Sequence, residues 1–207
     1  MFHTFAMLKQ GGWTMAPLGM CSLLALAIIL ERLLALRRRA VIDPKIMSAV
    51  EHCAGESSAT TLLSACQRAQ GAFAEVIAEV LRSRQLDYEH WVENMRAAGR
   101  VQMGKLERGL TTLEIIGGIS PLLGLLGTVL GMVDMFNAVS IAGLGNPQVL
   151  SDGIAKALIT TVCGLVIAIP AVAFHGIFTR RVEELATEIQ DQAMNLILRL
   201  RAERDSE

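Results

Sequence analysis

The sequence predicts an all-α membrane protein with three transmembrane helices and long helical extensions on the cytoplasmic side. Hydrophobic residues make up 52 % of the 207 residues, and they gather in three long apolar stretches. Basic residues lie almost entirely outside these stretches, which is typical of a protein that crosses a membrane several times. Because 19 % of the residues are charged, part of the chain must lie in water. The net charge of −1 gives no reason to expect nucleic acid as a partner.

About 20 apolar residues suffice for a helix to cross a bilayer. The expected spans are 12–36, 115–139 and 154–178. The second span contains one ionisable residue, Asp134, and the third contains Lys156 near its start and His175 near its end. The first ten residues lack the basic region of a cleavable signal peptide, so we expect the first apolar stretch to remain as a span.

The lysines and arginines predict the orientation. Of 19, 17 lie within 32–108 and 180–204, whereas the loop 140–153 has none. Loops that are rich in lysine and arginine stay on the cytoplasmic side of a membrane. We therefore expect the N-terminus and this loop to face outward and the C-terminus to lie in the cytoplasm.

These arguments divide the chain into six parts. They are the outward N-terminus with the first span (1–36), a cytoplasmic helical domain (37–113), the second span (114–139), a short outward loop (140–153), the third span (154–178) and a cytoplasmic helical tail (179–207).

Short helices are expected in the first half of the cytoplasmic domain. Asp43 followed by Pro44 is typical of a helix start, with an N-cap carboxylate and a proline at the first helical position. Ser57-Ser58 and Gly71 are interpreted as breaks, and 74–86 as helix again.

Two apolar stripes at helical spacing run through the rest of the chain. One comprises Val92, Met95, Gly99, Met103, Leu106, Leu110 and Leu113, and its phase continues into the second span. It predicts one continuous helix over 87–139. The other comprises Val182, Leu185, Ile189, Ala193, Leu196 and Leu200, and predicts that the third span extends far into the cytoplasm. Such stripes can reflect packing within a subunit, but one thin chain offers little core to cover both, which favours oligomerisation.

Small residues line both later spans. They include Gly124, Gly127, Gly131 and Gly164, which allow helix backbones to approach closely in lipid. Pro121 and Pro170 free backbone carbonyls, either at a simple kink or beside a watery cavity. Thr128 and Thr161 could line a transport pathway, or each could bond the carbonyl of its own preceding turn.

Motifs of enzymes and metal sites are absent from the sequence. No P-loop, H-E-x-x-H or nucleophile elbow occurs. The four cysteines, Cys21, Cys53, Cys66 and Cys163, form no C-x-x-C pair and are expected to be reduced. We expect neither an enzyme nor a cofactor or metal site.

Two motifs carry a resemblance to a known family. The run Ser120-Pro121-Leu122-Leu123-Gly124-Leu125-Leu126-Gly127-Thr128-Val129, followed by Gly131, resembles the second-span signature of the ExbB/TolQ proton-channel family, which is related more distantly to MotA. The third-span signature resembles the run that begins Gly153-Ile154-Ala155, continues through Ala157-Leu158, Thr161 and Gly164-Leu165, and ends at Ala168-Ile169-Pro170-Ala171.

The resemblance implies a ring of copies, five in the better-known members, in a bacterial inner membrane. It also implies an ExbD/TolR-like single-span partner whose membrane aspartate carries protons, and a TonB/TolA-like protein is a further candidate partner. Thr128 and Thr161 match the threonines that line the pore of the family. The implied function is that of a channel-forming stator subunit in a motor driven by the proton-motive force.

One residue departs from the family pattern. Lys156 stands where the family usually has glutamate, so a structural scaffold that has lost conduction is the alternative. If Thr128 and Thr161 lie at one depth, Asp134 and Lys156 lie within roughly 2 Å of a common level. They could then neutralise each other near the outer mouth, or Lys156 could extend to the interface instead.

Overall fold

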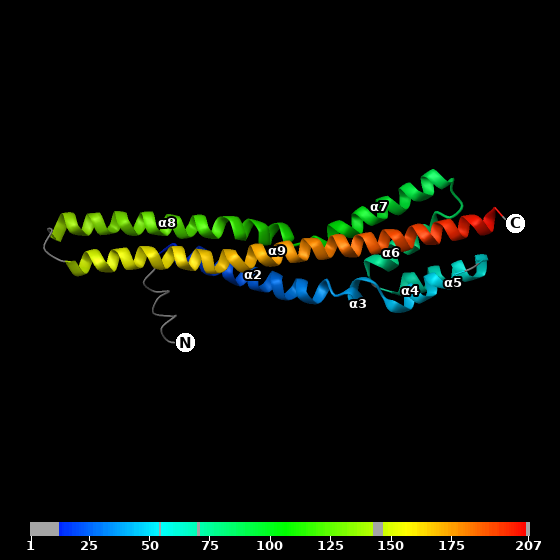
Figure 1. Cartoon of the computed structure of the whole chain (residues 1–207), viewed down its shortest axis with the longest axis horizontal. Helices are drawn as coiled ribbons and strands as arrows, with labels where there is room; N and C mark the ends of the chain where they lie inside the picture. The colour runs from blue at the N-terminus through cyan, green and yellow to red at the C-terminus, as the bar shows by residue number, and fades with distance from the viewer. Residues whose placement is uncertain (1–12, 54, 70, 143–146, 206–207) are drawn as a thin grey trace. The chain divides into compact units, whose positions relative to one another are not determined.

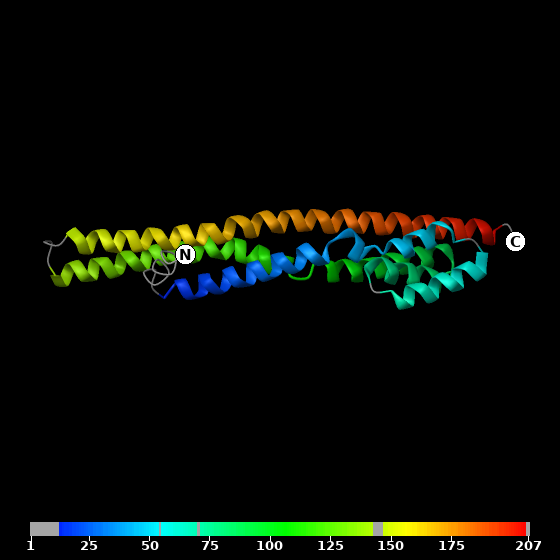
Figure 2. The ribbon, with the colours of Figure 1, turned by 90° about the horizontal axis from the view of Figure 1, so that it is seen from below.

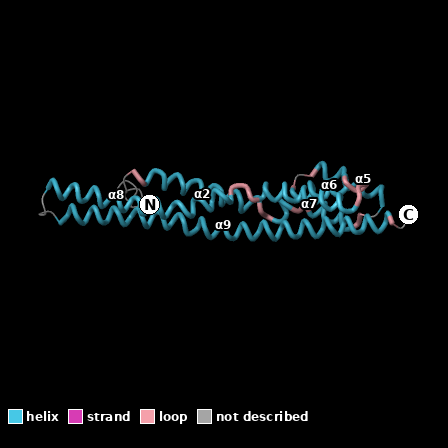
Figure 3. The backbone as a smooth tube through the Cα atoms, turned by 90° about the horizontal axis from the view of Figure 1, so that it is seen from above, coloured by secondary structure: helices cyan, strands magenta, loops and turns pink. Residues whose placement is uncertain are grey.

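The structure, a computed structural model, describes residues 13–53, 55–69, 71–142 and 147–205. Figures 1 and 3 show helix along nearly all of this part of the chain. The helices are α2 (Met15–Ala35), α3 (Arg38–Val41), α4 (Pro44–Glu51), α5 (Gly55–Arg68), α6 (Ala72–Arg82), α7 (Tyr88–Leu106), α8 (Leu110–Ala142) and α9 (Pro147–Arg204). No strand occurs among the described residues, so the predicted all-α class is confirmed.

Three helices within the described residues are long and apolar enough to cross a membrane. They are α2, most of α8 and the first part of α9. This confirms the number and order of the predicted spans. Helix α8 ends at Ala142 and helix α9 begins at Pro147, so both helices extend into the predicted loop 140–153.

The chain divides into two compact units. We call residues 1–30 and 109–176 the span unit, and residues 31–108 and 177–207 the polar unit. In the span unit, α8 and the first part of α9 run side by side in opposite directions (Figures 1 and 2).

The polar unit has a hydrophobic core built by α4, α5, α6, α7 and the second part of α9. Phe73 and Ile77 of α6 are fully buried there, as is Trp91 of α7. The indole Nε1 of Trp91 donates to the backbone oxygen of Val80 over 2.6 Å, which satisfies the polar atom of this buried side chain. Arg199 of α9 donates to the backbone oxygens of Val50 and Glu51 over 3.0 and 2.8 Å, and so caps the C-terminal end of α4.

The start of α4 agrees with the helix start that was predicted from the sequence. The Asp43 side chain accepts a hydrogen bond from the backbone N–H of Lys45 over 2.9 Å, and Pro44 is the first helical residue. This confirms the predicted N-cap. In contrast, Ser57-Ser58 lies inside α5, so the break expected there is wrong, while Gly71 does precede α6.

The predicted continuous helix over 87–139 is also wrong. The chain leaves helix after Leu106 and resumes it at Leu110 as α8. Gly109 has a φ of +84°, in the left-handed region where glycine carries no steric penalty. Apolar residues recur at helical spacing in the sequence on both sides of this site, but periodicity does not report the sign of φ.

Both apolar stripes find partners within one chain. Trp91, Val92 and Met95 of α7 and Leu185, Ile189 and Leu196 of α9 belong to the core of the polar unit. The inference that a single chain offers too little core to cover these stripes is therefore wrong. The short helices α4, α5 and α6 supply that core.

Candidate ion-pathway site between the second and third spans

Glycines set the distance between α8 and α9. A Cβ atom added at Gly164 would lie 2.5 Å from the backbone oxygen of Ser120, and one added at Gly124 would lie 3.0 Å from that of Thr160. At Gly127 it would lie 2.6 Å from Oγ1 of Thr160. Contacts below 3.0 Å cannot be accommodated without a shift, so the helices meet here backbone to backbone.

Two neighbouring threonines of α9 donate hydrogen bonds across this contact. The hydroxyl of Thr161 lies 3.3 Å from the backbone oxygen of Gly124, and that of Thr160 lies 3.4 Å from the same oxygen. Thr160 also donates to the carbonyl of Ala157 over 2.7 Å within its own helix. The oxygen of Gly124 can accept these bonds because glycine at this position lets the backbones of α8 and α9 approach closely.

Thr128 behaves differently. Its hydroxyl donates to the backbone oxygen of Leu125 over 2.7 Å, which is the carbonyl of its own preceding turn. This is the local bond that a threonine in a span commonly forms. Thr128 and Thr161 are both half-buried in the single chain, whereas Thr160 is 1 % exposed.

The register of the antiparallel pair gives the levels of these residues. Gly127 faces Thr160, and Gly131 faces Ala157 with 3.3 Å between the added Cβ and the Cβ of Ala157. Residue 128 is therefore level with about residue 159 of α9. At 1.5 Å per residue, the α-carbons of Thr128 and Thr161 lie about 3 Å apart along the helix axes.

Sequence reasoning missed two buried polar residues in this region. Ser120 is fully buried, and its Oγ has no hydrogen-bond partner among the described residues. Thr160 is buried beside Thr161, and only the helix register shows that it, and not Thr161, faces Gly127. The i, i+4 spacing of Ser120 and Gly124 was the available signal, since both lie on the face that contacts α9.

The two charged residues of the later spans are not brought together by described contacts. The Asp134 side chain is exposed in the single chain, and that of Lys156 lies outside the described residues. Gly131 opposite Ala157 and Gly153 opposite Met135 place both residues at similar levels of the helix pair. Near the other end, His175 Nε2 lies 3.9 Å from Glu114 Oε2, an ion pair when the imidazole is protonated.

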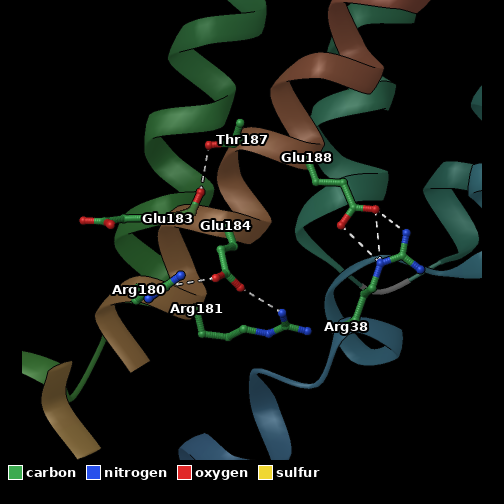
Figure 4. A network of polar contacts seen from close by, with 7 residues as sticks. All are labelled: Arg38, Arg180, Arg181, Glu183, Glu184, Thr187 and Glu188. Carbon is green, nitrogen blue, oxygen red and sulfur yellow. Dashed lines mark hydrogen bonds and ion pairs between the residues drawn. The ribbon is translucent and has the colours of Figure 1, made fainter. Parts of the chain in front are cut away.

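A separate polar network lies in the polar unit, directly after the third predicted span. Arg180 and Arg181 both donate to Glu184, over 3.2 and 3.1 Å (Figure 4). Hydrogen bonds from Arg181 and Arg180 hold the pKa of the Glu184 carboxyl below its ordinary value. Its contribution to stability is therefore present at neutral pH and disappears as the pH falls through the lowered pKa. Arg38 pairs with Glu188 in the same network (Figure 4).

Three apolar helices with polar groups at a close helix contact define a multi-pass helical membrane protein. A family model described as the MotA/TolQ/ExbB proton channel family matches residues 67–191, well over half of the chain. The chain belongs to this family, which confirms the resemblance of its second and third spans. The match begins in α5, so it includes about half of the polar unit as well as both later spans.

Relatives of the chain carry biopolymer-transport names. It is 53 % identical over 73 residues to the biopolymer transport protein exbB1 of Vibrio cholerae, covering 35 % of this chain and 32 % of that protein. It is 41 % identical over 91 residues to the biopolymer transport protein ExbB of Salmonella typhimurium, covering 44 % and 37 %. A putative biopolymer transport protein ExbB homolog of Methanothermobacter thermautotrophicus is 28 % identical over 185 residues, covering 89 % and 66 %. The chain thus spans less than two thirds of the length of each of these three relatives.

Proposed function

We propose that this chain is the channel-forming stator subunit of a motor driven by the proton-motive force. It would form a ring, most simply of five copies, in the bacterial inner membrane, with its C-terminus in the cytoplasm. An ExbD/TolR-like single-span partner would supply the membrane aspartate that carries protons, and a TonB/TolA-like protein would receive the force. The family match and the biopolymer-transport names of the relatives support this assignment.

The observation that carries the proposal is the polar contact between α8 and α9. Thr161 donates to the backbone oxygen of the buried Gly124, and Thr128 lies about 3 Å away along the axis. Two uncharged hydroxyls at similar levels of an apolar helix pair can accept a hydrogen bond from a protonated carboxyl group, and can donate to a carboxylate when they leave their present backbone acceptors, without binding it permanently. This is what a partner aspartate needs if it is to take up and release protons.

The test is proton flux in liposomes that contain the ring with its partner. Thr128→Val and Thr161→Val keep the shape of each side chain and remove the hydroxyl, and we expect each to abolish flux while assembly persists. Thr111→Val is the matched control, since Thr111 is exposed in α8 away from this contact. Normal flux in both span variants would contradict the pore assignment.

A non-conducting scaffold is the second candidate, because Lys156 stands where the family usually has glutamate. A wild-type ring that leaves a pH gradient intact in the presence of its partner would favour the scaffold.

We also propose that Asp134 and Lys156 neutralise each other, since the register of α8 against α9 supports similar levels for the two residues. In the same assay, Asp134→Lys and Lys156→Asp should each impair function and the double variant should restore it. Two harmless single variants would dismiss this pair.

A further inference from the structure

A basic groove lies in the polar unit, beside the ends of the first and third predicted spans. It has a volume of about 430 Å³, which is within the range of roughly 300–1,000 Å³ that is usual for ligand sites. Its lining consists of Arg32, Leu33, Leu36, Arg37, Ile177, Phe178, Arg180, Arg181 and Glu184. Four arginines against one glutamate leave a formal charge of +3. This excess of positive charge favours the binding of an anion.

One of the arginines is buried and incompletely paired. The Arg32 side chain is 8 % exposed, and its Nε has no hydrogen-bond partner among the described residues. Its two terminal nitrogens donate to Glu31 over 2.8 Å and to the backbone oxygen of Leu106 over 3.2 Å. Because the Glu31 side chain is 64 % exposed, water weakens the compensation that it gives to this buried charge. A negative group in the groove would compensate Arg32 further.

The other arginines are open to a ligand. Arg180 and Arg181 are 82 % and 41 % exposed, and each uses one donor nitrogen on Glu184. A guanidinium has five N–H donors, so both retain donors for a phosphate oxygen while the bond to Glu184 persists. Figure 4 shows both guanidiniums directed towards the Glu184 carboxylate. This carboxylate is therefore a competitor for any anion that enters.

The apolar part of the lining identifies the kind of anion. Leu33 and Ile177 are 45 % and 58 % exposed, and they lie in the last turns of the first and third predicted spans. Arg37, Arg180 and Arg181 follow a few residues later, where a span leaves the hydrocarbon. A free phosphate has no apolar part that could contact these side chains, whereas a phospholipid carries a charged phosphate next to its acyl chains. Basic pockets at helix ends are suited to lipids of this kind.

We propose that this groove binds an anionic phospholipid, with the headgroup phosphate on the arginines and an acyl chain against Leu33 and Ile177. Lipid binding in this groove does not depend on proton conduction, so this proposal can be tested independently of the proposed motor function. The lipid would link the end of α2 to α9 and neutralise charge where the chain leaves the membrane.

The experiment is native mass spectrometry of the full chain in a delipidating detergent, titrated with phosphatidylglycerol or phosphatidylcholine. We expect phosphatidylglycerol to bind at least 10-fold more tightly. Removing two arginines with R180Q/R181Q should weaken it by about 30-fold, at the usual contribution of a basic residue to anionic-lipid binding. The matched control R96Q/R100Q removes the same charge from the exposed face of α7 and should bind phosphatidylglycerol as the wild type does.

A third variant distinguishes a change in lipid binding from a folding defect, because it should bind the lipid more tightly and not more weakly. Glu184→Gln removes the competing carboxylate and should tighten phosphatidylglycerol binding by about 5-fold. Equal binding of the two lipids, or equal losses in the two arginine variants, would overturn the proposal. Displacement of phosphatidylglycerol by millimolar inorganic phosphate would also overturn it, because the site would then be one for a free anion.

Discussion

At Gly164 a single methyl group would meet the backbone of the neighbouring helix, since the added Cβ would lie 2.5 Å from the Ser120 oxygen. Gly118 of α8 has nothing within 4 Å of the same position. These two glycines of adjacent helices therefore have opposite roles. One is required by a close approach and the other is not.

We predict that Gly164→Ala lowers the thermal stability of the protein in detergent, by about 1–3 kcal/mol, as overpacking of a tight contact does. Gly118→Ala should leave the melting temperature unchanged or raise it, because alanine is the better helix former. The measurement is helicity by circular dichroism during heating. Equal effects of the two substitutions would show that the helix contact at Gly164 is looser than described.

Cys66 provides a second prediction at the scale of one residue. It is 3 % exposed in the core of the polar unit, and burial, with a smaller effect of Cys53, raises the pKa of its thiol to about 11. The thiol should therefore react with iodoacetamide at pH 8 about 100-fold more slowly than an unshifted thiol, on ionisation alone. Because the folded state holds this proton more tightly, stability should fall as the pH rises from about 9 towards 11. A variant with Cys66 as its single cysteine, labelled in buffer and in denaturant, tests this, and equal rates would refute it.

At the scale of elements, the break between α7 and α8 depends on Gly109. Its φ of +84° costs an L-residue about 1–2 kcal/mol, and less for asparagine. The site has ordinary space, since an added Cβ would lie 3.5 Å from Cγ2 of Ile28. The conformation, and not crowding, is therefore what requires glycine here.

We predict that Gly109→Ala destabilises the protein by about 1–2 kcal/mol and that Gly109→Asn costs less. Gly104→Ala is the control inside α7, where nothing lies within 4 Å of an added Cβ, and it should stabilise by about 0.5–1 kcal/mol. Chemical denaturation of the three variants tests the order. A gain in stability for Gly109→Ala would mean that a continuous helix, as the periodicity alone predicts, is accessible at this site.

At the scale of the whole molecule, apolar side chains remain exposed along all three span helices. Leu23 and Leu34 of α2, Leu122 and Phe136 of α8 and Val166 and Ile169 of α9 are each at least 60 % exposed in the single chain. In a membrane protein such side chains face lipid or other subunits. The apolar stripes themselves are largely buried within one chain, so they are not the surface on which a ring would depend.

We predict that native mass spectrometry of the detergent-solubilised protein shows a closed assembly, most simply a pentamer. Leu122→Ala and Val166→Ala should shift the assembly towards smaller species if their side chains lie between subunits. A monomer that keeps its helicity and its function with the partner would contradict the ring.

The sequence by itself determined the three spans, the Asp43–Pro44 start of α4 and the long extension of α9, because length, apolar content and local capping chemistry are properties of neighbouring residues. The sequence also identified the family, since its two glycine-rich motifs have a specific order of residues. Only the tertiary structure decided the break at Gly109 and the burial of the two apolar stripes within one chain. It also decided which of two adjacent threonines faces Gly127 and which four arginines share one groove. These features depend on contacts between segments up to 150 residues apart, and a periodic pattern along one helix holds no information about its partner.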